Sequence, residues 1–100
     1  MSLDSITEAV KARLAANAPF GHTILFDFGS AGVVHVDGTG PVPVVSNERH
    51  EAETTLTLTP ALFDEMLGGE GSATLAYMTG KLKISGSIGV ALKLNALLEA

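Results

Sequence analysis

Residues 80–98 change their hydrophobic period midway, and this change limits the folds open to the chain. Residues 81–85 alternate polar and apolar side chains, which predicts a half-buried strand. Gly86 and Ser87 interrupt the alternation, and from Ile88 onward the apolar residues follow a helical period. A strand followed at once by so apolar a helix requires a surface that buries the helix, either a sheet of the same chain or another molecule.

An amphipathic helix is predicted over residues 3–17. Its apolar stripe is formed by Leu3, Ile6, Val10 and Leu14. Ser2 and Ser5 are alternative caps at its start, and Ser5 has Glu8 at the spacing of a capping box.

Three strands are predicted to follow. Residues 22–28 alternate, with Ile24, Phe26 and Phe28 on one face, and residues 33–37 form the second strand of a hairpin. Residues 42–45 form the third strand, which Pro43 places at a sheet edge or a bulge.

Residues 53–59 give the clearest strand pattern, in which Glu53, Thr55, Thr57 and Thr59 share the face toward water while Leu56 and Leu58 face the interior. Thr59 is then a natural N-cap and Pro60 suits the first turn of a helix over residues 60–67. A shorter helix over residues 72–79 precedes the closing strand and helix. Hairpin-linked strands with helices on one face indicate an α+β architecture.

The chain of 100 residues is expected to form one domain, residues 1–100. It has no cysteine, no apolar run long enough to cross a bilayer and no signal peptide, which predicts a soluble cytoplasmic protein. The net charge of −5 argues against nucleic acid as a partner, because phosphate binding needs a basic surface.

The charge is unevenly distributed along the chain. Residues 1–79 carry three basic and ten acidic side chains, whereas residues 80–100 carry Lys81, Lys83 and Lys93 against the single acid Glu99. The C-terminal segment is therefore basic within an acidic chain, a difference that solubility of the strand and helix faces also explains.

Residue types used in catalysis are present, but their spacing gives no catalytic or metal-binding pattern. His22, His35 and His50 are not paired at metal-ligand spacing, and His35 is interpreted as a hydrogen-bonded strand residue. Residues 86–89 lack the spacing of a serine nucleophile elbow. We expect no metal, no cofactor and no catalytic residue.

Apolar surface is the remaining signal, since mean hydropathy is +0.34. The apolar arc of the last helix, formed by Val90, Ala91, Leu94, Leu97 and Leu98 and extended by Ile88 and Leu92, is too broad for one flat sheet to cover. Ordinary core packing explains each residue singly. Together with the methionines of the preceding helices, the arc also suits a lipid-binding slot, because flexible thioethers adapt to irregular ligands.

The segment after residue 75 closely resembles the end of the sterol carrier protein 2 family. Residues 76–94 read Ala-Tyr-Met-Thr-Gly-Lys-Leu-Lys-Ile-Ser-Gly-Ser-Ile-Gly-Val-Ala-Leu-Lys-Leu. The Thr-Leu-Thr-Leu strand and the capped helix after it also fit, and residues 22–75 match more weakly, in order. Ser87 stands where the family often has Asp or Asn, and Ser still caps a helix.

The resemblance implies a five-stranded, mostly antiparallel sheet with helices packed on one face around an apolar tunnel. It implies binding or transfer of a fatty acid, fatty acyl-CoA, sterol-like molecule or phospholipid, without catalysis. Lys81, Lys83 and Lys93 become candidates for meeting an anionic head group or a membrane surface. The expected ligand-binding residues are Phe26, Leu58, Phe63, Met66, Leu75, Met78, Ile84, Ile88, Leu92 and Leu98.

Three functions are therefore weighed. The leading one is a non-enzymatic lipid carrier, monomeric or homodimeric, with possible transient membrane contact. The second is an accessory or dimerisation module that docks a lipid-modifying enzyme through its apolar face. The third, an enzyme acting on acyl thioesters through His35, rests only on residue types. The chain ends without a peroxisomal signal, which favours a bacterial stand-alone member of the family.

Overall fold

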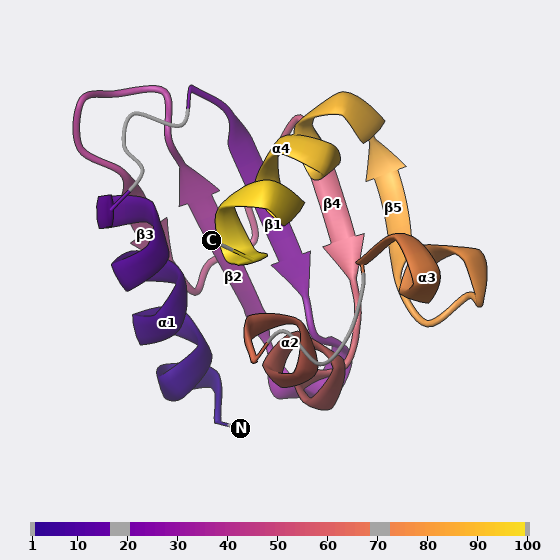
Figure 1. The fold of residues 1–100 in the computed structure, drawn as a ribbon. Coiled ribbons are helices and arrows are strands. Elements are labelled where there is room, and N and C mark those ends of the chain that lie inside the picture. The colour runs from indigo at the N-terminus through magenta and orange to yellow at the C-terminus, as the bar shows by residue number, and fades with distance from the viewer. Residues whose placement is uncertain (1, 17–20, 69–72, 100) are drawn as a thin grey trace.

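The computed structural model describes residues 2–16, 21–68 and 73–99, with backbone alone at residues 16, 73, 74 and 94–99. In chain order the elements are α1 (Leu3–Ala16), β1 (Thr23–Asp27), the 3-10 turn η1 (Gly29–Ala31), β2 (Val33–Asp37), β3 (Val44–Ser46), β4 (Thr54–Thr57), α2 (Pro60–Leu67), α3 (Ala73–Met78), β5 (Lys83–Gly86) and α4 (Ile88–Glu99) (Figure 1). The predicted order of helices and strands is confirmed over these residues. Asn17, the predicted end of the first helix, lies outside them.

The strands form one five-stranded sheet in the order β3-β2-β1-β4-β5. β1 and β2 form the predicted antiparallel hairpin, and β2–β3 and β4–β5 are antiparallel as well. β1 and β4 pair in parallel at the centre of the sheet, with Ile24 opposite Thr54 and Asp27 opposite Thr57. The sheet is therefore mixed but mostly antiparallel, as predicted, and β3 is an edge strand, as Pro43 indicated.

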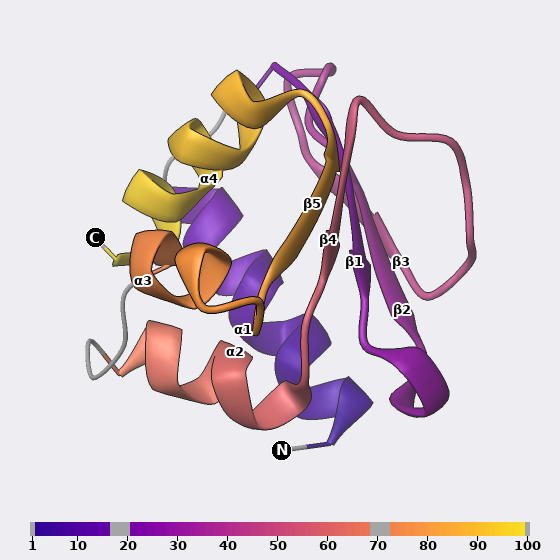
Figure 2. The same ribbon diagram turned by 90° about the vertical axis from the view of Figure 1, so that its right-hand side faces the viewer.

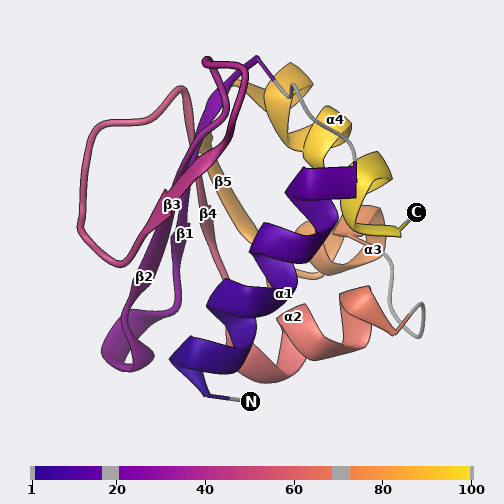
Figure 3. The ribbon, with the colours of Figure 1, turned by 90° about the vertical axis from the view of Figure 1, so that its left-hand side faces the viewer.

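All four helices cover the same face of the sheet, which is seen edge-on in Figures 2 and 3. The core lies in this layer, where α1 contributes Ile6 and Val10 and β1 contributes Ile24 and Phe26, all almost fully buried. Leu56 and Leu58 join the same cluster and Thr57 is exposed, so the predicted inward face of β4 is confirmed. The α+β fold with helices on one face is thus confirmed.

The opposite face of the sheet is partly covered by the loop from β3 to β4 (Figure 2). His35 lies on this face, is 7% exposed and has its Nε2 atom 3.0 Å from the Glu51 carbonyl oxygen in that loop. Leu25, which broke the predicted alternation of β1, is also buried. The loop explains why apolar side chains occur on a face that a two-layer fold would otherwise leave to water.

Side-chain caps start three of the helices. The Ser5 N–H donates to Ser2 Oγ at 3.2 Å, so Ser2 rather than Ser5 caps α1. The Leu62 N–H donates to Thr59 Oγ1 at 3.1 Å, and the Val90 N–H donates to Ser87 Oγ at 3.3 Å. Ser87 therefore serves as the cap that the family resemblance implied.

β5 begins at Lys83, two residues later than predicted. The N–H groups of Lys81 and Leu82 both donate to the Ala76 carbonyl oxygen of α3, at 2.9 and 3.1 Å, and so do not pair with β4. Lys81 and Leu82 continue the polar–apolar alternation of the strand, so the sequence pattern does not show that their N–H groups bond to α3 and not to β4.

Gly86 ends β5 where the chain passes very close to the start of β4. Its φ is +96°, and a Cβ atom there would collide with the Glu53 carbonyl oxygen. The same carbonyl oxygen accepts a hydrogen bond from the Ser87 N–H at 3.0 Å. A residue without a side chain is thus required at the point where β5 turns into α4.

We expect Gly86→Ala to lower the free energy of unfolding by about 1–3 kcal/mol for the disfavoured backbone alone, with the collision adding to this loss. Gly89→Ala is the matched control, because its Cβ has only ordinary contacts and alanine favours a helix. Urea unfolding of both variants measures the difference. Equal stability of the two would show that Gly86 is not needed for the turn.

Candidate functional site

The predicted ligand-binding residues fall into two groups. Phe26, Leu58, Phe63 and Met66 are buried together between the sheet and α2, and Ile84 is half-buried against the same cluster. The rings of Phe26 and Phe63 meet edge to face at 5.6 Å. This group forms an apolar layer in which side chains from β1, β4, β5 and α2 are in contact.

The second group lies on the outside of the helices. The exposed fractions run from 53% at Ile88 to 76% at Met78, with Leu75 and Leu92 between them. Among the α4 side chains that the structure describes, Val90 and Ala91 are buried while Ile88 and Leu92 are exposed, so the apolar arc of this part is wider than its buried face. The structure therefore does not bring these four residues together with the buried group, and the side chain of Leu98 lies outside the described residues.

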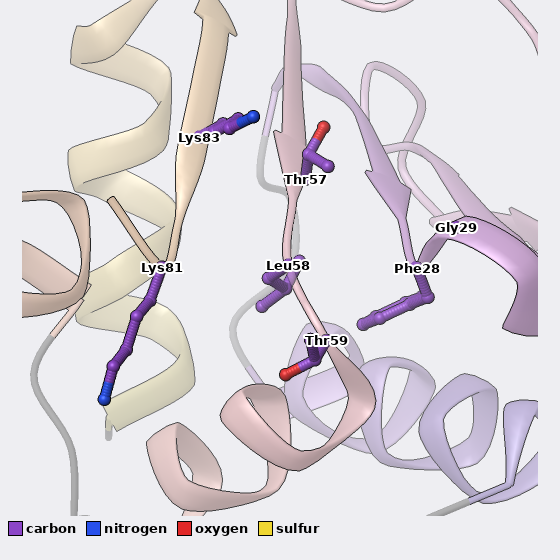
Figure 4. Close-up of a pocket in the computed structure, with 7 residues that line it drawn as sticks. All are labelled: Phe28, Gly29, Thr57, Leu58, Thr59, Lys81 and Lys83. Carbon is purple, nitrogen blue, oxygen red and sulfur yellow. The ribbon is translucent and has the colours of Figure 1, made fainter. Parts of the chain in front are cut away.

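A pocket of about 250 Å³ opens at the lower ends of β4 and β5 (Figure 4). It is lined by Phe28, Gly29, Thr57, Leu58, Thr59, Lys81 and Lys83. In Figure 4 the two lysines lie on one side and Phe28 on the other, with Leu58 and Thr59 between them. Among the predicted ligand-binding residues whose side chains the structure describes, Leu58 alone lines it. Lys81 and Lys83, the predicted head-group candidates, do lie here.

The pocket residues that sequence reasoning missed are Phe28, Gly29, Thr57 and Thr59. Phe28 and Leu58 had been placed correctly on inward strand faces, but nothing in their periodicity showed that the two strand ends would be adjacent. The two strand ends are adjacent because β1 pairs in parallel with β4. The last hydrogen bond of this pairing runs from the Leu58 N–H to the Asp27 carbonyl oxygen, at 3.1 Å.

Lys93, the third lysine of the basic segment, is engaged elsewhere. Its Nζ lies 3.2 Å from His22 Nε2, and His22 Nδ1 lies 3.3 Å from the Glu53 carboxylate. The Thr23 N–H also donates to this carboxylate at 2.9 Å. This polar chain joins α4 to the start of β1 and to the residue before β4, and it does not reach the pocket lining.

Hydrogen bonds lower the pKa of Glu53 below its ordinary value of 4.5. The largest cause is the bond from the Thr23 N–H, followed by the bond from His22. The pKa of Asp27 is also lowered, first by the hydrogen bond from the Gly29 N–H and then, against a smaller effect of burial, by Arg49. These carboxylates therefore favour the folded chain in their ionised form.

A metal site in this chain would need several histidine or acidic side chains grouped together. No group of three or more within residues 2–16, 21–68 and 73–99 could hold a metal ion. The His35 ring faces the Glu51 carbonyl oxygen and packs against His50 with centroids 5.1 Å apart, which confirms the prediction of a hydrogen-bonded strand residue. No helix in the described ranges is long and apolar enough to cross a membrane.

Comparison with known sequences gives a match along nearly the whole chain. The profile of the SCP-2 sterol transfer family matches residues 4–99. A relative from Xenopus laevis, described as hydroxysteroid dehydrogenase-like protein 2, is 40% identical over 48 residues, which are 48% of this chain and 12% of the relative. The chain thus corresponds to a small part of that relative's length.

Solved structures share the fold. Sterol carrier protein 2 from Aedes aegypti, solved in complex with the C16 fatty acid palmitate, has a TM-score of 0.74 at 22% identity, over 98% of this chain and 96% of its own. A protein described as UbiJ-SCP2 ubiquinone synthesis protein has a TM-score of 0.69 at 14% identity, over 97% of this chain and 91% of its own. At such identities the likeness is one of fold.

The lowered pKa of Glu53 predicts a loss of stability in acid. Ionised Glu53 stabilises the folded chain above its ordinary pKa of 4.5, and this contribution disappears as pH falls through the lower pKa of the folded state. Between about pH 6 and about pH 3, the midpoint of urea unfolding should fall less in Glu53→Gln than in the original chain.

Glu65→Gln, which neutralises an exposed carboxylate of α2, controls for the change of net charge alone. It should keep the acid sensitivity of the original chain. If the unfolding midpoint of Glu53→Gln fell with pH as much as that of the unsubstituted protein, the hydrogen bonds of Glu53 would not contribute to the stability of the fold.

Proposed function

The chain belongs to the SCP-2 sterol transfer family, and from this premise we propose that it binds and carries a single-chain lipid such as a fatty acid or its acyl-CoA. The observation that carries the proposal is the apolar layer between the sheet and the helices, formed by Phe26, Leu58, Phe63, Met66 and Ile84. The palmitate complex of the Aedes aegypti protein, which has the same fold, supports this class of ligand.

The free energy for binding comes from removing acyl methylenes from water, about 0.8 kcal/mol for each CH₂ that becomes buried. The side chains of this layer are buried against one another, so an acyl chain that enters it displaces some of them. Met66 is suited to this, because its unbranched thioether changes rotamer at low cost. The exposed Leu75, Met78, Ile88 and Leu92 supply further apolar surface on α3 and α4.

The proposed role is carriage without chemistry, in a single domain and in the cytoplasm. The ring of His35, the residue on which the acyl-thioester enzyme hypothesis rested, is buried against the β3–β4 loop and hydrogen-bonded to its backbone. A nucleophile or general base needs access to a substrate, which this position does not give.

A second function is favoured by the exposed apolar side chains of α3 and α4. Leu75, Tyr77 and Met78 from α3 and Leu92 from α4 are each about half exposed or more. Such side chains suit an accessory module that pairs with itself or docks a lipid-modifying enzyme. The structural likeness to the UbiJ-SCP2 ubiquinone synthesis protein supports this alternative.

For a lipid carrier, affinity should rise with chain length. Displacement of a fluorescent fatty acid by saturated fatty acids of increasing length should give a dissociation constant that falls by up to about fourfold per added CH₂, until the chain outgrows the site. Mass spectrometry of lipids extracted from the purified chain should find an acyl lipid. Absence of both a co-purified lipid and fluorescent fatty acid binding would overturn the proposal.

For an accessory module, the purified chain should form a lipid-independent dimer in size-exclusion chromatography with light scattering. Met78→Glu should then restore a monomer without loss of stability, because an exposed position tolerates such a change within about 0.5 kcal/mol. Thr57→Glu, an exposed position on β4, is the matched control and should leave the dimer intact. A monomer that binds fatty acid supports the carrier instead.

A further inference from the structure

The pocket at the strand ends exists because β4 and the segment before β5 separate there. Thr57 and Lys83 are the last pair of the β4–β5 ladder. Beyond this pair Leu58 stays with β1, while Lys81 bonds to the α3 backbone at Ala76. The two segments diverge, and the pocket of about 250 Å³ lies over the end of β4, between the segment that carries the lysines and Phe28 with Gly29.

The two sides of this opening differ in chemistry. Lys81 and Lys83 line one side, and in Figure 4 the Lys83 ammonium group points toward Thr57 while that of Lys81 extends in the opposite direction. Within the described part of the chain neither lysine makes an ion pair. α2 begins directly after Thr59, so the positive end of its dipole lies at the same opening. Residues 71–98 contain no Asp or Glu. The carboxylate of Asp27 accepts a hydrogen bond from the N–H of Gly29, on the side of the pocket opposite the lysines, and is paired with Arg49.

The other side is apolar and continuous with the core. Phe28 and Leu58 line the pocket and also belong to the buried cluster. The ring of Phe28 meets that of Phe63 edge to face at 5.6 Å, and Phe63 meets Phe26 in the same way at the same distance. A chain that displaces Phe28 would therefore pass directly into the apolar layer behind it.

We propose that this pocket is the head-group site for a single-chain lipid carboxylate. Lys83 holds the carboxylate, Lys81 joins it after a change of side-chain rotamer, and Phe28 and Leu58 cover the first methylenes. The proposal rests on the proposed lipid-binding function and specifies the ligand within it: an ionised fatty acid rather than a neutral sterol. A volume of about 250 Å³ is below the roughly 300–1,000 Å³ of sites that enclose a whole drug-sized ligand, so only one end of the lipid fits here.

The test compares decanoate with decan-1-ol, which has the same chain length without the charge. Displacement of a fluorescent fatty acid is measured for the original chain, for Lys81→Gln and for Lys83→Gln. Each substitution should weaken decanoate binding about two- to fivefold, the range of an exposed ion pair. Binding of decan-1-ol should not change, which also shows that each variant is folded.

Lys11→Gln is the matched control, since Lys11 is an exposed lysine of α1 paired with Glu8. It should leave both ligands unaffected. In a two-dimensional amide spectrum, decanoate should shift the signals of Gly29, Leu58 and Thr59 at concentrations that occupy the site. The head-group effect should weaken as salt is added, because the pocket is open to solvent.

Three results would overturn the inference, and they differ in what they leave standing. If decanoate and decan-1-ol bind and neither pocket substitution matters, the lipid function stands and the head group lies elsewhere. If inorganic phosphate shifts the same amide signals and displaces decanoate, the pocket binds soluble anions instead. If neither lipid binds even to the original chain, the proposed function fails with it.

Discussion

The parallel pairing of β1 with β4 is the contact on which the rest of the molecule depends. It places the second half of the chain beside the first at the centre of the sheet, with Phe26 opposite Leu56. Because β4 leads directly into α2, the same pairing brings Phe63 over Phe26 and closes the apolar layer. Without this register, the helices of the second half would have no apolar face of the sheet on which to pack.

The same pairing also creates the pocket. β1 and β4 end together, so Phe28 and Leu58 are neighbours at the edge of the core. β5 follows β4 only as far as the pair of Thr57 and Lys83 and is then drawn to α3. Two sets of backbone hydrogen bonds therefore produce the proposed carboxylate site: those of β4 with β1, and those of Lys81 and Leu82 with Ala76 of α3. The segment that turns toward α3 bears the lysines at the edge of the site.

At the other end of β4 and β5 the chain is held together much more closely. Gly86 passes over the Glu53 carbonyl group at a distance that leaves no room for a side chain, and Glu53 in turn binds Thr23 and His22. Lys93 extends this polar chain to α4. One end of the sheet is thus fixed by backbone contacts and charged side chains, and the proposed carboxylate site lies at the opposite end.

The sequence by itself determined most of the local structure. Alternation gave the inward faces of β1 and β4, Thr59 and Ser87 marked two helix starts, and Pro43 marked the edge strand. The family resemblance indicated the fold class. These features depend on neighbours within a few residues, so local propensity and period reveal them.

Only the tertiary structure decided which apolar residues share a layer. Met66 and Met78 both belong to predicted helices and were both expected in the ligand site, yet Met66 is buried between α2 and the sheet and Met78 is exposed on α3. Likewise, the alternation of polar and apolar residues begins at Lys81, yet the Lys81 N–H donates to the Ala76 carbonyl oxygen of α3 and not to β4. The physical reason is that strand pairing and helix packing join residues far apart in the chain, and the period of a segment specifies a face but not what lies against it.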